Sequence, residues 1–198
     1  DRYNNPNNTP YFPEFGSDSV LLGAYNTPKD FFQTGGVLET AVNISGGNDK
    51  ANFVAGLSRM NNQGIVINNE VTRTSMNFGG NTTLDNGIFI GGSMTYVNTD
   101  LTSPPSTGLF SGGPSVTQRL LFTPPNVNVK GLPYQDANGN QAFYRPDNDN
   151  PYFLAHHAPH TSDVDRYFGN FNIGYDVFEW LNVTYKVGFN GFTDRKLE

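Results

Sequence analysis

The chain has 198 residues, a formal net charge of −6 at pH 7 and no cysteine. The acidic balance argues against binding to nucleic acid, because phosphate backbones select proteins with an excess of Lys and Arg. The lack of cysteine excludes disulfides, thiolate nucleophiles and cysteine zinc sites. Only 15% of the residues are charged, yet no apolar run approaches the ~18 residues that a membrane-spanning helix requires.

The order of residues predicts a loop followed by strands. Residues 1–36 are rich in Asn and Pro, which favour turns. Beyond them, six runs alternate apolar and polar residues with the period of two that is typical of β-strands, whereas helical periodicity is weak throughout. The runs cover residues 37–46, 51–60, 70–80, 87–98, 165–177 and 181–192. The chain opens without Met and ends directly after the last run, and we interpret it as an internal piece of a larger protein.

The two faces of these runs differ in chemistry. One face is largely apolar, and the other holds mainly Asn, Ser, Thr and Gly rather than the Lys and Glu of an ordinary soluble sheet. An apolar face opposite a polar face with few charged residues is typical of a transmembrane β-barrel, whose outside meets lipid and whose inside is wet. In the last run the residues expected to face lipid are Leu181, Val183, Tyr185, Val187 and Phe189.

The connections alternate between short and long. Pairing Ile44 with Ala51 would leave Gly47-Asn48 as a two-residue turn, and pairing Val177 with Leu181 would leave a turn of comparable length. The intervening connections, 61–69 and 99–164, are longer. Short turns on one side and long loops on the other indicate the periplasmic and extracellular ends of an outer-membrane barrel.

Two blocks resemble the SusC/RagA-type TonB-dependent outer-membrane transporters of Bacteroidetes. The first block, 30–66, contains counterparts of the family's "FF-x-T-G" segment, of its "SGGN(D/E)K(A/T)N(F/Y)" turn and of "N-x-x-G-I-V". The matching residues of this block include Phe31, Phe32, Thr34, Gly35, Ser45, Asn48, Lys50, Phe53, Asn62, Gly64 and Val66. The second block, 150–194, is similar to the family's "NPYW…DRFIGN…YDFTPWLSL" segment. Its matching residues include Asn150, Tyr152, Asp165, Arg166, Asn170, Tyr175, Asp176 and Trp180.

The resemblance implies an all-β antiparallel fold in which about six strands belong to a larger barrel of about 22 strands. Residues 1–36 would form an extracellular loop leading into the barrel, 37–98 four barrel strands, 99–164 a long extracellular loop, and 165–198 a barrel hairpin. The implied function is import of glycan or peptide fragments across the bacterial outer membrane, without enzymatic activity. The implied partners are a SusD-like surface lipoprotein that forms a lid, the TonB complex acting through a plug domain, and the lipid and lipopolysaccharide of the membrane.

The long loop carries the candidate contact residues. Its aromatic and imidazole side chains suit contact with substrate or with the lid, because rings bury large areas while losing few rotamers. The candidates are Tyr144, Tyr152, Phe153, His156 and His157. Packing within the loop itself is the alternative for each of them. Catalytic residues are not predicted, because the sequence has no nucleophile elbow, P-loop, dinucleotide fingerprint or HExxH motif.

No cofactor is predicted, and each of two candidate metal sites has a simpler explanation. His156, His157 and His160 form an HHxxH cluster with imidazoles suited to zinc, but Pro159 disrupts regular spacing. Asp136 and the run 147–150 offer oxygen ligands that suit calcium in an extracellular loop, although the EF-hand spacing is missing. The segment DANGN is explained more simply as a hairpin turn.

Two other functions fit the composition. A soluble or secreted all-β module that binds carbohydrate or mediates adhesion also alternates apolar and polar residues. It would stay monodisperse without detergent. A barrel that serves as a scaffold in a surface complex without transporting anything would differ from an importer only in its partners.

Overall fold

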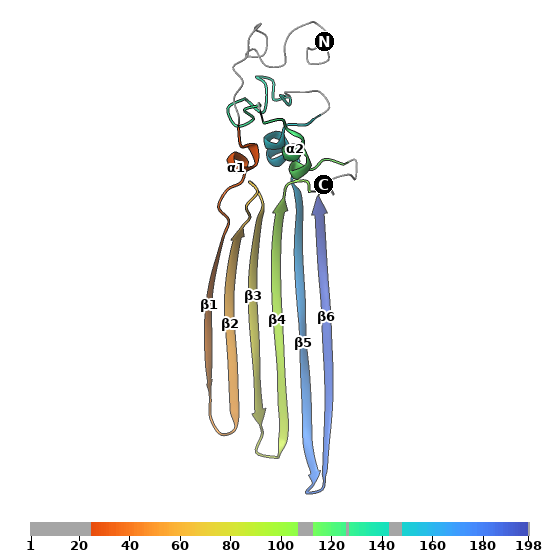
Figure 1. Ribbon diagram of the computed structural model, residues 1–198. Helices are drawn as coiled ribbons and strands as arrows, with labels where there is room; N and C mark the ends of the chain where they lie inside the picture. Colours follow the sequence, from red (N-terminus) through yellow and green to blue (C-terminus); the bar gives the residue numbers. More distant parts are fainter. Residues whose placement is uncertain (1–24, 107–112, 126, 143–147, 198) are drawn as a thin grey trace, which may run out of the picture.

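The computed structural model describes residues 25–106, 113–125, 127–142 and 148–197, and within them it forms one six-stranded antiparallel sheet in the order β1 to β6 (Figure 1). The strands are β1 (Gly36–Gly47), β2 (Ala51–Gln63), β3 (Glu70–Thr83), β4 (Ile88–Ser103), β5 (His160–Phe178) and β6 (Leu181–Leu197). Three short helices, α1 (Thr27–Phe31), α2 (Val116–Phe122) and α3 (Pro151–His157), lie at one end of the sheet. The predicted all-β antiparallel class is confirmed.

The connections divide between the two ends of the sheet. The turns between β1 and β2, β3 and β4, and β5 and β6 lie at the end away from the helices, and the longer connections lie at the helical end (Figure 1). The longest connection covers 104–159 rather than 99–164, because the ladder continues through pairs such as Thr99↔Val164 and Leu101↔Ser162. The expected boundary was set where the alternation of apolar and polar residues ends. Backbone pairing continues beyond that point.

The register of the first hairpin differs from the expected one. Ile44 pairs with Ala55 instead of Ala51, and Gly47 pairs with Asn52. The turn is displaced by two residues to Asp49-Lys50, where the Asn48 N–H donates to the Ala51 carbonyl at 2.7 Å. The Asn48 side chain supports this position, because its Oδ1 accepts hydrogen bonds from the backbone N–H groups of Lys50 and Ala51, both at 2.9 Å. In the last hairpin the expected register holds from Thr161↔Leu197 through Asp176↔Asn182, after which a β-bulge brings Phe178 opposite Leu181.

The pairing places like residues on the same face across all the strands. One row joins Val42, Leu57, Met76, Tyr96 and Tyr167 on neighbouring strands. We call this side the apolar face. Its exposed apolar members are Leu38, Val42, Ile44, Phe53, Leu57, Met76, Phe78, Met94, Tyr167, Phe171, Ile173, Tyr175, Val177, Val183, Tyr185, Val187, Phe189 and Leu197.

The opposite side of the sheet, which we call the amide face, is dominated by asparagine. Two of its side-chain hydrogen bonds cross between strands, Asn52 Nδ2 to Asn81 Oδ1 at 3.0 Å and Asn170 Nδ2 to Ser93 Oγ at 2.9 Å. Its asparagines are Asn43, Asn52, Asn62, Asn77, Asn81, Asn170, Asn172, Asn182 and Asn190. The amide face thus satisfies polar groups largely without ion pairs.

The buried core lies beside the sheet rather than on it. It is a small cluster in which Phe31 of α1, Leu120 of α2 and Leu154 of α3 meet, with Val66, Ile67 and Tyr152 packed against it. We call the described parts of 25–35, 64–69 and 104–159 the cap. Neither face of the sheet contributes to this core, and Tyr185 in the middle of β6 is 66% exposed. The sheet therefore leaves its apolar face uncovered by any described residue.

Local signals explain the cap helices, which the sequence pattern missed. Asn26, Ser115 and Asn150 cap α1, α2 and α3, each accepting a hydrogen bond from a backbone N–H of the first turn. Pro28 and Pro151 occupy the first turns of α1 and α3, where a missing N–H costs nothing. The helices have only 5 to 7 residues, which is too few for a helical period to stand out.

Adjacent leucines on α2 test the cap core. Leu120 is 2% exposed and Leu121 is 59% exposed. We expect Leu120→Ala to destabilise the cap by about 2–5 kcal/mol, because it leaves a cavity among the three helices. Leu121→Ala should change the stability by about 0.5 kcal/mol or less. Amide hydrogen exchange of 115–122 and 150–157 in the full-length protein measures both, and equal acceleration in the two variants would contradict this packing.

Candidate functional site

Side-chain hydrogen bonds join three separate segments into the cap. Gln33 Nε2 donates to the carbonyl of Gly64 at 3.0 Å, and Asn68 Nδ2 donates to the carbonyl of Ala155 at 3.0 Å. The hydroxyl of Tyr152 donates to the carbonyl of Asp30 at 3.3 Å. The segment before β1, the connection between β2 and β3, and α3 are therefore held together, although the residues involved lie up to 122 positions apart.

Tyr152 is an anchor inside the cap. Its ring meets the Phe31 ring edge-on, with centroids 4.9 Å apart. Burial, and then the negative charge of Asp30, raise the pKa of Tyr152 above its ordinary value. The hydroxyl therefore stays protonated and remains a donor. Tyr152 was expected to contact substrate or the lid, or to pack within its own loop. Its observed contacts are with other residues of the cap.

An aromatic cluster lies next to this anchor and contains three of the predicted contact residues. The rings of Phe153 and His157 stack with centroids 4.3 Å apart, and those of Tyr134 and His156 stack at 5.1 Å. Tyr134 also approaches His157 at 6.0 Å. Both histidines are exposed, so the cluster presents ring edges and imidazole nitrogens to the outside. The fifth predicted residue, Tyr144, lies outside the described residues.

The polar contacts of the histidines and of Asp136 are with protein groups. His156 Nδ1 lies 3.0 Å from Asn68 Nδ2, which fits a neutral imidazole that accepts at Nδ1. Asp136 Oδ1 accepts from the backbone N–H groups of Asn138 and Asn140, both at 2.8 Å. The Asn140 side chain first, and then these backbone donors, lower the pKa of Asp136. DANGN is thus a hairpin turn, and across the described ranges no three His, Asp or Glu side chains gather as a metal site.

A half-buried ion pair fixes α2 to the segment before α3. Arg119 Nη2 lies 2.8 Å from Asp149 Oδ2, and Arg119 Nε donates to the same oxygen at 3.0 Å. Gln141 Nε2 donates to the other carboxylate oxygen at 3.3 Å. Sequence reasoning missed this contact because its partners are 30 residues apart and belong to no motif.

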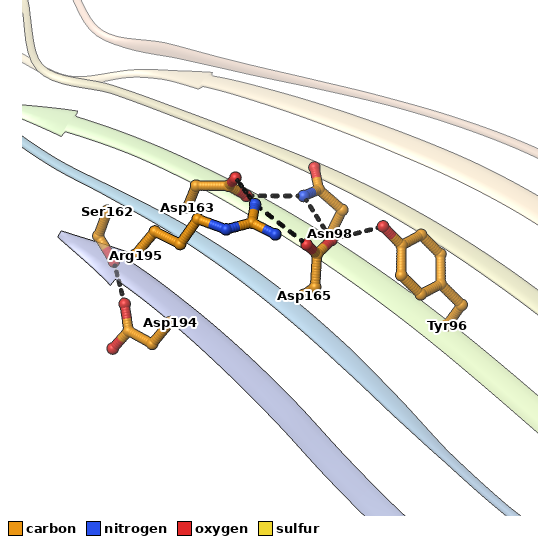
Figure 2. A network of polar contacts seen from close by, with 7 residues as sticks. All are labelled: Tyr96, Asn98, Ser162, Asp163, Asp165, Asp194 and Arg195. Atoms are coloured by element: carbon orange, nitrogen blue, oxygen red, sulfur yellow. Dashed lines mark hydrogen bonds and ion pairs between the residues drawn. The ribbon is translucent and has the colours of Figure 1, made fainter.

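A polar network closes the apolar face at its helical end (Figure 2). Tyr96 donates through its hydroxyl to Asp165, and Asn98 Nδ2 donates to Asp163 at 2.9 Å and to Asp165 at 3.0 Å. Arg195 Nη1 lies 2.9 Å from Asp163 and 3.6 Å from Asp165. The apolar face therefore ends at the row of Tyr96 and Tyr167, beyond which charged and amide groups replace most of the apolar ones.

The five residues predicted to face lipid alternate along β6. They pair with β5 residues of the apolar face, as in Tyr185↔Ile173 and Val187↔Phe171. The four that follow Leu181, namely Val183, Tyr185, Val187 and Phe189, are exposed. Their shared orientation away from Asn182, Thr184 and Lys186 follows from the strand period.

Comparisons with known proteins add no assignment. Neither the protein-family models nor the curated proteins contain a match to this chain. In the part of the chain that the structure describes, no helix is long and apolar enough to cross a membrane.

Proposed function

We propose that this chain is part of the barrel wall of a TonB-dependent outer-membrane importer of the SusC/RagA type. In this role it takes up glycan or peptide fragments and performs no chemistry of its own. The single observation that carries the proposal is a sheet one layer thick whose apolar face is uncovered and whose other face is lined with amides. The motif resemblance of 30–66 and 150–194 supports the choice of family.

The energetics of the apolar face favour lipid as its covering. Burying a Val, Leu, Ile, Phe or Met side chain is worth about 1.5–3 kcal/mol relative to leaving it in water. Exposing this many apolar side chains to water would forgo tens of kcal/mol of burial free energy, more than the ~5–15 kcal/mol net stability of a typical domain. A second sheet, which a soluble sandwich needs, does not occur among the described residues. The single-layer sheet therefore favours the barrel over the soluble module.

The height of the apolar face fits a bilayer. From Tyr167 to Val177, strand β5 advances ten residues, about 33 Å at roughly 3.3 Å per residue. A strand tilt of about 40° reduces this to about 25 Å, the height of the apolar band of outer-membrane barrels. Aromatic residues mark both limits, with Tyr96 and Tyr167 at one end and the stacked rings of Phe178 and Trp180, 5.5 Å apart, at the other.

The stagger of the turns supports closure into a barrel. The pairing of the first hairpin ends at Gly47↔Asn52, and the row of paired residues through Asn52 crosses the sheet to Asn172 on β5. The last hairpin continues beyond this row, to Phe178↔Leu181. Figure 1 shows the same progression along the turn end. Barrels require such stagger, because their strands tilt. Strands β1 and β6 each pair on one side only within the described sheet, and open edges in lipid are unstable, so the proposal requires further strands.

In this arrangement the cap is extracellular and the short turns are periplasmic. The amide face lines the lumen, and the exposed rings of the aromatic cluster meet substrate or a SusD-like lid lipoprotein. Force from the TonB complex would act through a plug domain. A scaffold barrel without transport shares all of these features except uptake, so measured uptake distinguishes the two.

Lysine substitutions at two neighbouring residues of β6 test which face of the sheet meets lipid. Tyr185 lies near the middle of the apolar face, and Thr184 points to the opposite side. We expect Tyr185→Lys to destabilise the barrel in lipid vesicles by about 2–4 kcal/mol, because it places a charge near the bilayer midplane. Thr184→Lys should cost far less, since it points into the wet lumen. Equal unfolding free energies for the two variants would contradict the assignment of faces.

Cysteine labelling on whole cells tests the orientation, because the chain has no natural cysteine. We expect a membrane-impermeant maleimide to label Asn140→Cys in the cap and to leave Asn48→Cys in the first short turn unlabelled. After the outer membrane is permeabilised, both positions should react. Labelling of residue 48 but not residue 140 on intact cells would reverse the topology.

The aromatic cluster provides the test of lid contact. We expect Phe153→Ala combined with His157→Ala to weaken lid binding about tenfold or more, because clustered rings commonly supply over 1 kcal/mol each at interfaces. Leu121→Ala, an exposed apolar residue on another helix of the cap, is the control and should bind normally. Affinity is measured between the purified full-length barrel and lipoprotein. Unchanged affinity in the double variant would remove the cluster from the interface.

A further inference from the structure

Four residues of the last hairpin form a compact group on the amide face near its helical end. Arg166 on β5 pairs directly with Phe192 on β6, and Phe168 pairs with Asn190 in the next row of the same face. The guanidinium carbon of Arg166 lies 5.3 Å from the centre of the Phe168 ring, within cation–π range. Arg166 Nε also donates to Asn190 Oδ1 at 3.4 Å. The guanidinium thereby lies over the Phe168 ring, in the row that pairs with Phe192.

Phe192 is out of place on this face. Its side chain is 71% exposed, and its neighbours on the same side include the polar Arg166, Asn190 and Asp194. Leaving a phenylalanine ring in water forgoes about 1.5–3 kcal/mol. The lipid-facing argument does not apply to it, because it points opposite to Phe189. Part of this exposure belongs to the open edge of β6, which pairs on one side only within the described sheet; an aromatic ring in the polar phase of the strand nevertheless offers a surface against which a ligand can pack.

Arg166 retains hydrogen-bonding capacity for such a ligand. Among the described residues it forms no ion pair. The carboxylate nearest along the same face, Asp194, is already occupied by Lys196 at 3.0 Å and by the Ser162 hydroxyl at 3.0 Å. A guanidinium has five N–H donors in a planar fork that matches a carboxylate, and only one of them is used by Asn190.

We infer that Arg166, Phe168, Asn190 and Phe192 form a binding site for carboxylate-bearing sugar units. The apolar C–H side of a sugar ring would pack on the exposed ring of Phe192. The Arg166 fork would bind the carboxylate in two parallel hydrogen bonds, and the free Asn190 amide N–H groups would donate to ring hydroxyls. The inference rests on the proposed function, in which the amide face lines the import path, and it narrows the substrate to acidic glycans.

The experiment compares two probes that share one sugar backbone, one with free carboxylates and one with the carboxylates neutralised as methyl esters. Trigalacturonic acid and its methyl ester are titrated into the purified full-length protein in detergent, and binding is measured by calorimetry. We expect Arg166→Gln to weaken binding of the acid about tenfold or more while leaving binding of the ester unchanged. Phe192→Ala should weaken binding of both probes. Lys186→Gln removes a cation from the same face several rows away and should leave binding of both probes unchanged.

Three results would overturn the inference. They are equal affinity of the wild-type protein for acid and ester, equal loss in the Arg166→Gln and Lys186→Gln variants, and no loss in Phe192→Ala. A heat-modifiability shift on electrophoresis shows that each variant still forms its barrel. Failure of the proposed function gives a different result, because a protein that stays monodisperse without detergent would contradict the membrane assignment whatever it binds.

Discussion

The exposed apolar face of a single-layer sheet is the constraint on which the rest of the structure depends. A sheet normally buries its apolar side against a second layer. Here the only buried core among the described residues lies in the cap, around Leu120 and Leu154, beside the sheet and not upon it. The proposal of a lipid-facing wall removes this conflict, because acyl chains then occupy the place of the second layer.

The polar parts of the sheet are consistent with that arrangement. The network of Asp163, Asp165 and Arg195 begins where the apolar residues stop, beyond Tyr96 and Tyr167. Such a network would be costly within hydrocarbon and is well placed at head-group level. On the other face, asparagine pairs such as Asn52 with Asn81 satisfy polar groups without introducing large net charge. In the proposed barrel this face would line the lumen and offer hydrogen bonds to solutes.

The strands and their faces could be predicted from the sequence, because the alternation of apolar and polar residues depends on the strand itself and not on the rest of the fold. Sequence reasoning placed the last hairpin in register through Asp176↔Asn182. It misplaced the first turn by two residues, because the Asn48 side chain accepts from the backbone of Lys50 and Ala51 and so favours a turn at Asp49-Lys50 rather than at Gly47-Asn48. It also missed the cap helices, whose few residues show caps and prolines but no periodicity.

The candidate site was only partly predictable. The rings of the long loop were recognisable, but their partners were not, since the contacts of Tyr152 with Asp30 and of His156 with Asn68 join residues far apart in the chain. Phe168 and Phe192 did carry a signal, because each breaks the alternation by placing an aromatic residue in the polar phase of its strand. Residues that break the apolar–polar alternation of a strand tend to occur at functional positions.

Spin labels placed singly along 181–191 of the full-length protein in lipid bilayers test the central claim most directly. Collision rates with oxygen, which partitions into lipid, and with a water-soluble nickel chelate are measured at each position. The account predicts a period of two, with odd-numbered positions open to oxygen and even-numbered positions open to nickel. Nickel access at Val183, Tyr185 and Val187 equal to that at Asn182, Thr184 and Lys186 would contradict a lipid-facing wall.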